Sequence, residues 1–307
     1  MEKIKETIEK YIKKYLHVTH NSHFVKKEYL RKWSKDGKRI LTCTMVENID
    51  VIRYIGLNNI CVEKDMYKLE TLNECEIQFI KEYYKDSPIF VRLINNEFLE
   101  QWQLFCRSVD CIEKEINISF ENVRIQKGED LQSEYEQNLT EKLKANLYSK
   151  SEEFLNNDNE KLCFLLFLFT QYIRTQKVKE TIISNYYNNV PMNEKESINI
   201  EKIWKVLIFV IANMCAFNFI KQKNQHLKFI ISTAGNLITS DQPIISIGFD
   251  KKNQDIFYFP LTPYLGIIFP SGEYKKEEDN ASLIEELNDK IRNNSHRFVF
   301  IFSKKFK

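Results

Sequence analysis

Three histidines stand near the start of the chain at three-residue spacing, His17, His20 and His23. On a helix they would project in roughly the same direction. The unperturbed pKa of histidine lies near neutrality, so an imidazole can exchange protons at physiological pH. We therefore treat His23 as a candidate general acid or base; the alternative is that these rings make only local hydrogen bonds. Zinc could use such nitrogens, but no second Cys or His pair stands at metal spacing, and we expect no metal site.

A basic segment follows, from Lys26 to Arg39. Its seven Lys and Arg and two acidic residues give a local net charge of +5, against +2 for the whole chain. Cations attract phosphates, and aromatic rings can stack on bases. We therefore expect Lys26, Lys27 and Tyr29 to bind substrate and Arg31 to hold a phosphate oxygen. The alternative is an ordinary solvated face.

Two later motifs place polar residues beside strongly apolar runs. Gln171 and Arg174 lie at the end of the most apolar predicted helix, where polar groups must find partners. Arg174 could clamp an anion with two hydrogen bonds, or pair with an internal carboxylate such as Asp241. Ser240 and Asp241 lie between apolar runs. We expect Ser240 to bind substrate, and Asp241 could orient a catalytic group from a loop. Alternatively, its side chain binds its own backbone in a turn.

Several function classes lack their sequence signals. The chain has no Walker loop, G-x-G-x-x-G motif, nucleophile elbow or H-E-x-x-H motif. Its seven cysteines are scattered and include no C-x-x-C pair, which favours reduced thiols in the cytoplasm. The first residues lack the apolar core of a signal peptide. We expect a cytoplasmic protein without a bound cofactor.

One apolar run, Ile203–Ile220, approaches the ~20 residues that a membrane span needs. Lys205 and Asn213 lie on one side of the helix it would form, and bulky apolar residues lie on the other. This distribution is typical of a central core helix that packs against its neighbours. We therefore expect no membrane span.

Helical periodicity predominates early in the chain and strand signals late. Glycine and proline are scarce, at 7 and 6 residues, which favours long helices. We expect helices from a Thr71-x-x-Glu74 capping box to Tyr84, after Ser87-Pro88, and at 130–147, 151–175, 178–188, 200–221 and 280–293. We expect strands at 39–46, 116–120, 227–232, 243–247, 256–259, 265–269 and 297–302.

These patterns predict an α+β fold that is predominantly helical. A smaller antiparallel β lobe would be built mainly from the C-terminal third of the chain. The sequence shows neither an internal repeat nor a low-complexity linker. We therefore expect a single domain, 1–307, with a helix-rich part at 1–225 and the β-rich lobe at 226–307.

Short motifs in a fixed order resemble an uncharacterised bacterial family, domain of unknown function 4238. The stretch His23–Trp33 is similar to the family's His-Tyr-Val-Pro-Gln-x-Tyr-Leu-Arg-x-Phe, although Lys26 and Lys27 replace its Pro and Gln. Further similar pieces are Asp65–Tyr67, Gln171–Thr175, Ser240–Pro243 and Phe259–Pro263. The resemblance implies a single module and no established activity. The sporadic occurrence of such proteins suggests phage defence, by association.

Our leading hypothesis is an RNA-directed endonuclease or toxin-like effector in bacterial phage defence. Metal-free RNA cleavage needs a proton carrier near the 2′-hydroxyl and cations for the developing charge. His23 would carry the proton, Arg31 and Arg174 would hold phosphate oxygens, and Asp241 would orient the reacting groups. Gln171 would complete the site.

Two alternatives use the same residues differently. The chain could be an enzyme that acts on a phosphorylated small molecule, such as a nucleotide or NAD, in a cleft. It could also be a non-enzymatic sensor or protein-binding module, in which the polar motifs only cap helices and turns. The first two hypotheses require that His23, Arg31, Gln171, Arg174 and Asp241 converge in one open recess.

Overall fold

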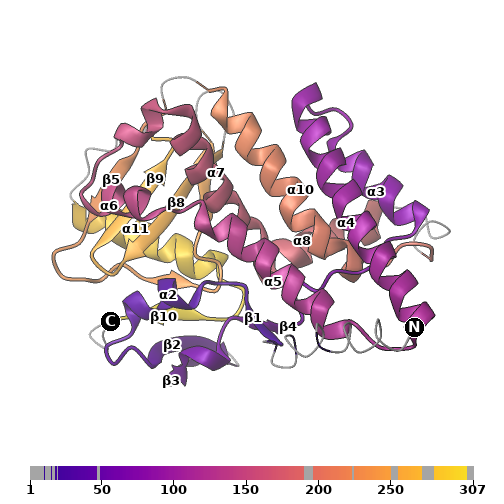
Figure 1. Cartoon of the computed structure of the whole chain (residues 1–307). Helices are drawn as coiled ribbons and strands as arrows, with labels where there is room; N and C mark the ends of the chain where they lie inside the picture. The colour runs from indigo at the N-terminus through magenta and orange to yellow at the C-terminus, as the bar shows by residue number, and fades with distance from the viewer. Residues whose placement is uncertain are drawn as a thin grey trace. The chain divides into compact units, whose positions relative to one another are not determined.

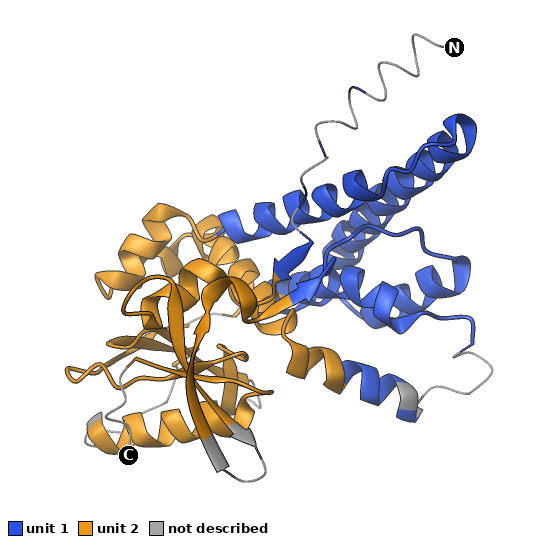
Figure 2. Ribbon diagram, turned by 90° about the horizontal axis from the view of Figure 1, so that it is seen from below, with its two compact units in different colours: residues 1–22, 63–138, 182–217 blue, residues 23–62, 139–181, 218–307 orange. Residues whose placement is uncertain are grey.

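The computed structural model describes residues 10, 15, 18, 20–46, 49–189, 196–222, 225–249, 255–271 and 280–302. Within these residues the protein has an α+β fold with long helices and two four-stranded antiparallel sheets (Figure 1). The chain divides into two compact units (Figure 2). Unit 1 comprises Met1–Ser22, Glu63–Asn138 and Ile182–Phe217, and unit 2 comprises His23–Val62, Leu139–Thr181 and Asn218–Lys307. The units therefore interleave along the chain and do not coincide with the expected division at residue 225.

Unit 1 is built around long helices. They are α3 (Glu74–Tyr84), α4 (Ile89–Ile116), α5 (Glu121–Gln137) and most of α10 (Ile200–Ile220). In the described part of the chain, α10 is the one helix long and apolar enough to cross a membrane, and 61% of its most apolar window is buried in the protein. Ile203, Trp204 and Leu207 are almost wholly inaccessible. This burial is what a core helix shows.

The start of α3 differs from the prediction by two residues. The capping box is formed by Asn73 and Glu76 and not by Thr71 and Glu74. The Glu76 backbone N–H donates to Asn73 Oδ1, and the Asn73 backbone N–H donates to Glu76 Oε2, both at 2.8 Å. The hydroxyl of Thr71 instead donates to Asp110 at 2.6 Å. The two boxes have similar sequence signals, and tertiary contacts select between them.

The strand expected at 116–120 is wrong. Helix α4 runs to Ile116 and ends at Asn117, whose φ of 54° is the left-handed conformation common at helix ends. The Phe120 N–H then donates to Glu113 Oε1 at 2.6 Å, and α5 begins at Glu121 and not at 130. Phe120 packs with Val109 and Val123. A five-residue alternation is too short to separate a strand from a helix end followed by a turn.

Unit 2 contains both four-stranded sheets. One has the order β5-β9-β8-β7, and the other has the order β3-β2-β10-β6. The first sheet consists of β5 (Lys228–Ile231), β7 (Ile245–Phe249), β8 (Asp255–Thr262) and β9 (Leu265–Phe269). The second consists of β2 (Arg39–Val46), β3 (Ile49–Gly56), β6 (Thr239–Ser240) and β10 (Val299–Ile301). The strand expected at 39–46 is confirmed, and its sheet joins strands from both ends of the chain.

Alternating side chains of β8 pack on two different helices. Phe257 and Phe259 have ring centroids 5.4 Å from Phe169 and 6.3 Å from Phe167 of α7 (Asp158–Ile173). Tyr258 belongs instead to the apolar cluster that includes residues of α11 (Asn280–Asn294). Since neighbouring side chains of a strand point to opposite faces, α7 and α11 cover opposite faces of this sheet.

The remaining elements are short or connect the larger ones. They are α2 (Lys27–Leu30), η2 (Arg31–Trp33), η3 (Leu57–Asn59), α6 (Glu141–Tyr148), η4 (Glu153–Asn156), α8 (Gln176–Asn189), and the paired strands β1 (Asn21–His23) and β4 (Val62–Lys64). The helix expected at 130–147 is therefore divided into the end of α5 and a separate α6. Thr140 begins α6, because its hydroxyl accepts the Leu143 N–H at 3.2 Å.

Candidate functional site

Unit 2 contains a cavity of about 650 Å³. Its walls come from α2 and η2, from α6 and the residue before its cap, from α7, and from β8. Uncharged residues in the lining are Tyr29, Leu139, Ala145, Leu147, Tyr148, Phe167, Gln171, Phe259 and Leu261. Charged residues in the lining are Lys26, Glu28, Arg31, Lys32, Glu141 and Lys144. The volume lies within the range of ~300–1,000 Å³ that is usual for small-molecule sites.

Tyr29 connects the short helix α2 to the sheets of unit 2. Its hydroxyl donates to Pro260 O at 2.7 Å and lies 2.6 Å from Thr239 Oγ1. Its ring stacks on Phe259 with centroids 5.3 Å apart and lies against Trp33. Burial raises the pKa of the Tyr29 phenol well above its usual value. The hydroxyl is therefore a structural donor at neutral pH, and the ring forms part of the cavity wall.

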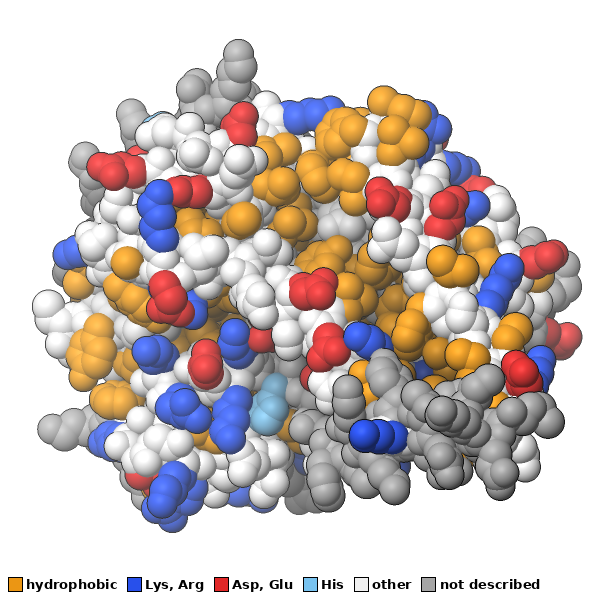
Figure 3. Space-filling model, in the orientation of Figure 1, with side chains coloured by type: hydrophobic (Ala, Val, Ile, Leu, Met, Phe, Trp, Pro, Cys, Tyr) orange, Lys and Arg blue, Asp and Glu red, His pale blue; other side chains and the backbone are white. Residues whose placement is uncertain are grey.

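Positive charge predominates in the lining of the cavity. Arg31 is exposed, and its side chain has no ion pair or hydrogen bond among the described residues. Lys32 Nζ lies 5.6 Å from the centroid of the Tyr148 ring. Lys144 pairs with Glu141 at 2.6 Å, and this hydrogen bond lowers the pKa of Glu141. In Figure 3, Lys and Arg side chains gather at the lower left of the face, where Figure 1 places α2 and β2.

Gln171 and Arg174 form a connected pair in which only Gln171 reaches the cavity. The amide nitrogen of Gln171 donates to Phe24 O at 3.0 Å, and its oxygen accepts from Arg174 Nη2 at 2.6 Å. Arg174 is 1% exposed and does not line the cavity. The arginine therefore fixes the orientation of Gln171 and cannot reach a ligand in this cavity.

Asp241 organises the backbone just before β10. Its Oδ1 accepts the His296 N–H at 2.9 Å, and its Oδ2 accepts the N–H groups of Arg297 and Phe298 at 2.7 and 2.9 Å. Burial raises the pKa of this carboxyl, and the three backbone hydrogen bonds oppose the rise. Ser240 donates to Gln242 O at 2.8 Å. Neither Ser240 nor Asp241 lines the cavity.

His20 and His23 bind different partners, and neither of them lines the cavity. His23 Nε2 bonds to Leu57 O at 2.9 Å, and His23 is not in the cavity lining. In unit 1, His20 Nδ1 lies 2.7 Å from Asp65 Oδ1. His17 lies outside the described residues. No group of three potential metal ligands occurs in the part of the chain that is described.

The cavity therefore brings together Lys26, Tyr29, Arg31 and Gln171 from the predicted site residues. It does not include the others, which are His23, Lys27, Arg174, Ser240 and Asp241. Sequence reasoning missed the contribution of α6. Glu141, Lys144 and Tyr148 stand three and four residues apart, so they share one face of that helix. This helical spacing can be recognised in the sequence. It does not show that this face of α6 lies beside α2 in the cavity wall.

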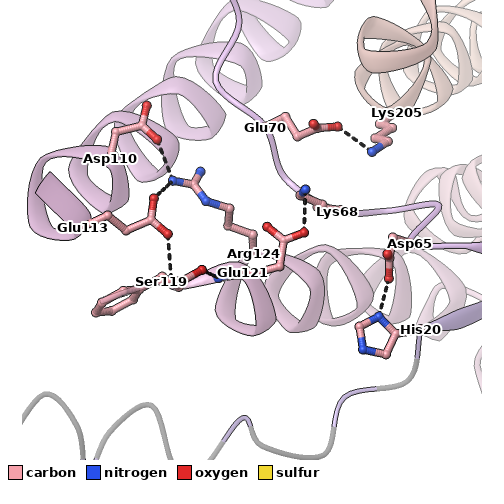
Figure 4. Close-up of polar contacts among 11 residues, drawn as sticks. His20, Asp65, Lys68, Glu70, Asp110, Glu113, Ser119, Glu121, Arg124 and Lys205 are labelled. Atoms are coloured by element: carbon pink, nitrogen blue, oxygen red, sulfur yellow. Dashed lines mark hydrogen bonds and ion pairs between the residues drawn. The ribbon is translucent and has the colours of Figure 1, made fainter. Parts of the chain in front are cut away.

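Unit 1 carries a separate set of charged contacts (Figure 4). Arg124 Nη2 donates to Asp110 at 2.6 Å and to Glu113 at 3.0 Å, and these partners raise the pKa of Arg124 although burial alone would lower it. Lys205 pairs with Glu70 at 2.5 Å. In both contacts, opposite charges of unit 1 pair with each other. We therefore assign this set a role in holding the helices of unit 1 together.

Comparisons with known proteins give one match. A family model described as "Protein of unknown function (DUF4238)" matches residues 21–305. No curated protein matches the chain. No solved structure matches it either.

Proposed function

Because the chain belongs to the DUF4238 family, whose description assigns no activity, we propose a function from the cavity itself. We propose that unit 2 binds a small ligand that combines a phosphate group with a flat ring, as a mononucleotide does. The observation that carries the proposal is the presence of the unpaired Arg31 and several aromatic rings in the lining of one cavity.

The phosphate would bind at the cationic part of the lining. The guanidinium of Arg31 can give two parallel hydrogen bonds to a phosphate, and such charge-assisted bonds are among the strongest in proteins. Lys26 and Lys32 line the same cavity and add positive charge. Arg31 is already exposed and ready to accept an anion, so binding would not have to break an internal ion pair.

The ring of the ligand would bind against the aromatic part. Tyr148 is 46% exposed and offers a ring face, and Phe167 and Phe259 are buried beneath the surface. Stacking of a base on an aromatic side chain contributes roughly 1–3 kcal/mol. Lys32 lies over the Tyr148 ring. A base would therefore stack on the face of the Tyr148 ring that Lys32 does not cover.

The arrangement gives less support to RNA cleavage by His23. The imidazole is bonded to Leu57 O, and the carboxylate of Asp241 is occupied by three backbone N–H groups. The side chains of His23, Asp241 and Arg174 do not line the cavity. The proposal therefore concerns binding of a small ligand. Cleavage of RNA and a role in phage defence stay hypotheses from the sequence.

The test is a titration of the purified full-length chain by isothermal calorimetry. AMP, ATP, NAD, adenosine and inorganic phosphate serve as probes, so that ring and phosphate contributions are measured separately. We expect saturable binding of a nucleotide, weaker binding of adenosine and phosphate alone, and a loss of about tenfold or more in affinity for Arg31→Ala.

The control variant is Arg107→Ala, which removes an exposed arginine of α4 in unit 1. It should bind as the wild type does. The proposal fails if no nucleotide binds saturably, or if Arg31→Ala and Arg107→Ala leave affinity equally unchanged. Preference for NAD over mononucleotides would identify a dinucleotide ligand for the same cavity.

A further inference from the structure

Three tyrosines of unit 2 have side chains that are nearly half exposed. The exposed fraction is 48% for Tyr54, 46% for Tyr148 and 48% for Tyr264. Tyr148 lines the cavity, whereas Tyr54 and Tyr264 do not. Because an exposed aromatic ring can stack on any base, unit 2 offers stacking surfaces beyond the cavity as well as within it.

The rings are associated with cations of one short segment, residues 32–39. Lys32 Nζ lies 5.6 Å from the centroid of the Tyr148 ring. Arg39 Cζ lies 5.5 Å from the centroid of the Tyr54 ring on the outer strand β3. The pairing of a cation with a ring that occurs in the cavity wall is therefore repeated outside the cavity.

Lys35 belongs to the same series. Its Nζ lies 5.5 Å from the centroid of the Phe302 ring, and that ring lies 6.0 Å from the ring of Tyr264. Lys35 stands three residues after Lys32 and four before Arg39. Seven residues span at most about 25 Å, so the three cations lie close enough for one extended ligand.

Much of the charge of this segment is available to an external anion. Residues 32–39 contain four cations and one carboxylate, which give a net charge of +3. Arg39 pairs with that carboxylate, Asp36, through Nε at 3.0 Å. Lys35 and Lys38 are exposed, and within the described part of the chain no acidic side chain pairs with either of them.

We propose that unit 2 binds a single-stranded nucleic acid, with a terminal nucleotide in the cavity and the next nucleotides along residues 32–39. The inference rests on the proposed function, because a strand end can enter the cavity only if the cavity accepts a nucleotide. A ligand in which phosphates and flat bases alternate matches a surface on which cations and rings alternate. A duplex keeps its bases stacked inside, and an anionic membrane offers phosphates without bases.

The test compares AMP with 5′-phosphorylated oligoadenylates of two, four and eight nucleotides, by isothermal calorimetry on the full-length chain. Affinity should rise with length, by roughly tenfold or more from AMP to the octanucleotide, because more phosphates and bases are bound. Binding of the octanucleotide should weaken as salt is added. A duplex of the same length should bind more weakly than the single strand.

Two variants remove a cation and a ring outside the cavity. Lys35→Ala and Tyr54→Leu should each weaken binding of the octanucleotide by roughly fivefold or more and leave the affinity for AMP unchanged. Arg31→Ala, within the cavity, should weaken binding of both ligands. The matched controls are Lys114→Ala, an exposed lysine of α4 in unit 1, and Phe249→Leu, a 64% exposed ring of β7. Both should bind as the wild type does.

The outcomes separate this inference from the proposed function. If AMP binds and the octanucleotide binds no more tightly, the inference is wrong and the proposed function stands. If neither AMP nor any oligonucleotide binds, both are wrong. The inference also fails if Lys35→Ala weakens binding no more than Lys114→Ala, or if the duplex binds as tightly as the single strand. Vesicles of anionic phospholipid that displace the octanucleotide from Lys35 and Tyr54 would assign the surface to a membrane instead.

Discussion

At the residue scale, Arg31 and Arg174 show how location decides the role of one side-chain type. Both were expected to hold phosphate oxygens. Arg31 is exposed in the lining of the cavity, whereas Arg174 is 1% exposed and donates to Gln171. A guanidinium recognises phosphates and amide oxygens with the same donors. Residue type alone therefore cannot distinguish a ligand-binding arginine from one that orients a neighbour.

Asp241 gives a prediction at this scale. Asp241→Asn keeps the shape of the side chain but replaces one acceptor oxygen with a donor, so at least one of the three backbone N–H groups loses its partner. A buried donor without a partner costs about 1–3 kcal/mol. We therefore expect the free energy of unfolding to fall by roughly that amount in urea denaturation.

The matched control is Asp289→Asn, an exposed residue of α11. Its free energy of unfolding should stay within about 0.5 kcal/mol of the wild type. Equal values for the two variants would show that the carboxylate of Asp241 does not stabilise this part of the chain.

At the scale of elements, one buried side chain joins the starts of two helices of unit 1. Glu76 is 1% exposed and accepts the backbone N–H of Asn73 at the start of α3 and that of Asn199, just before α10, at 2.8 and 3.2 Å. It also pairs with Lys202 at 2.6 Å. One carboxylate thus caps two helix N-termini within unit 1, where negative charge is favourable.

Glu76→Ala should therefore destabilise the protein by roughly 3 kcal/mol, because it leaves a largely buried lysine and two backbone donors without their carboxylate. Glu74→Ala is the control, since Glu74 is exposed in the first turn of the same helix. It should cost less than about 1 kcal/mol. Thermal unfolding followed by circular dichroism compares the two, and a larger effect at Glu74 would contradict the assigned capping box.

The long elements follow from the sequence, and the short junctions do not. Periodicity over 16 to 28 residues identifies α7, α10 and α4, because many apolar positions support each assignment. At Ile116–Phe120 only five residues were available, and the tertiary contacts of Phe120 decided the structure. The cavity follows the same rule. The α2 side of the cavity could be recognised in the sequence as a basic and aromatic segment. The α6 side could not, because it depends on contacts between segments that are distant in the sequence.

At the scale of the whole molecule, the two units share the chain in alternating segments. Each unit is assembled from three stretches, and the β3-β2-β10-β6 sheet of unit 2 needs both β2 and the late strand β10. Cys43 lies opposite Val299 in this sheet. A cut at the boundary that the sequence suggested, after residue 225, would therefore remove strands that the early part of unit 2 requires.

We expect a fragment of residues 1–225 to lose the folded structure of unit 2, because β2 would lack its β10 neighbour and α7 would lose its contacts with β8. A fragment of residues 21–302 keeps every strand described here and should keep its fold. Near-ultraviolet circular dichroism and the cooperativity of thermal unfolding distinguish them. A cooperative, native-like transition in the shorter fragment would refute this interdependence.

The pairing of β2 with β10 also has a consequence for folding during synthesis on the ribosome. A ribosome adds about 5–20 residues per second, so the β2–β3 hairpin emerges on the order of 10–50 s before its neighbour β10. During that interval both long edges of the hairpin lack a partner within their own chain. Nascent chains on the same messenger RNA could then pair with the free edge of β2 before β10 of the same chain is made. Chaperones that shield the β2–β3 hairpin should therefore raise the yield of folded protein.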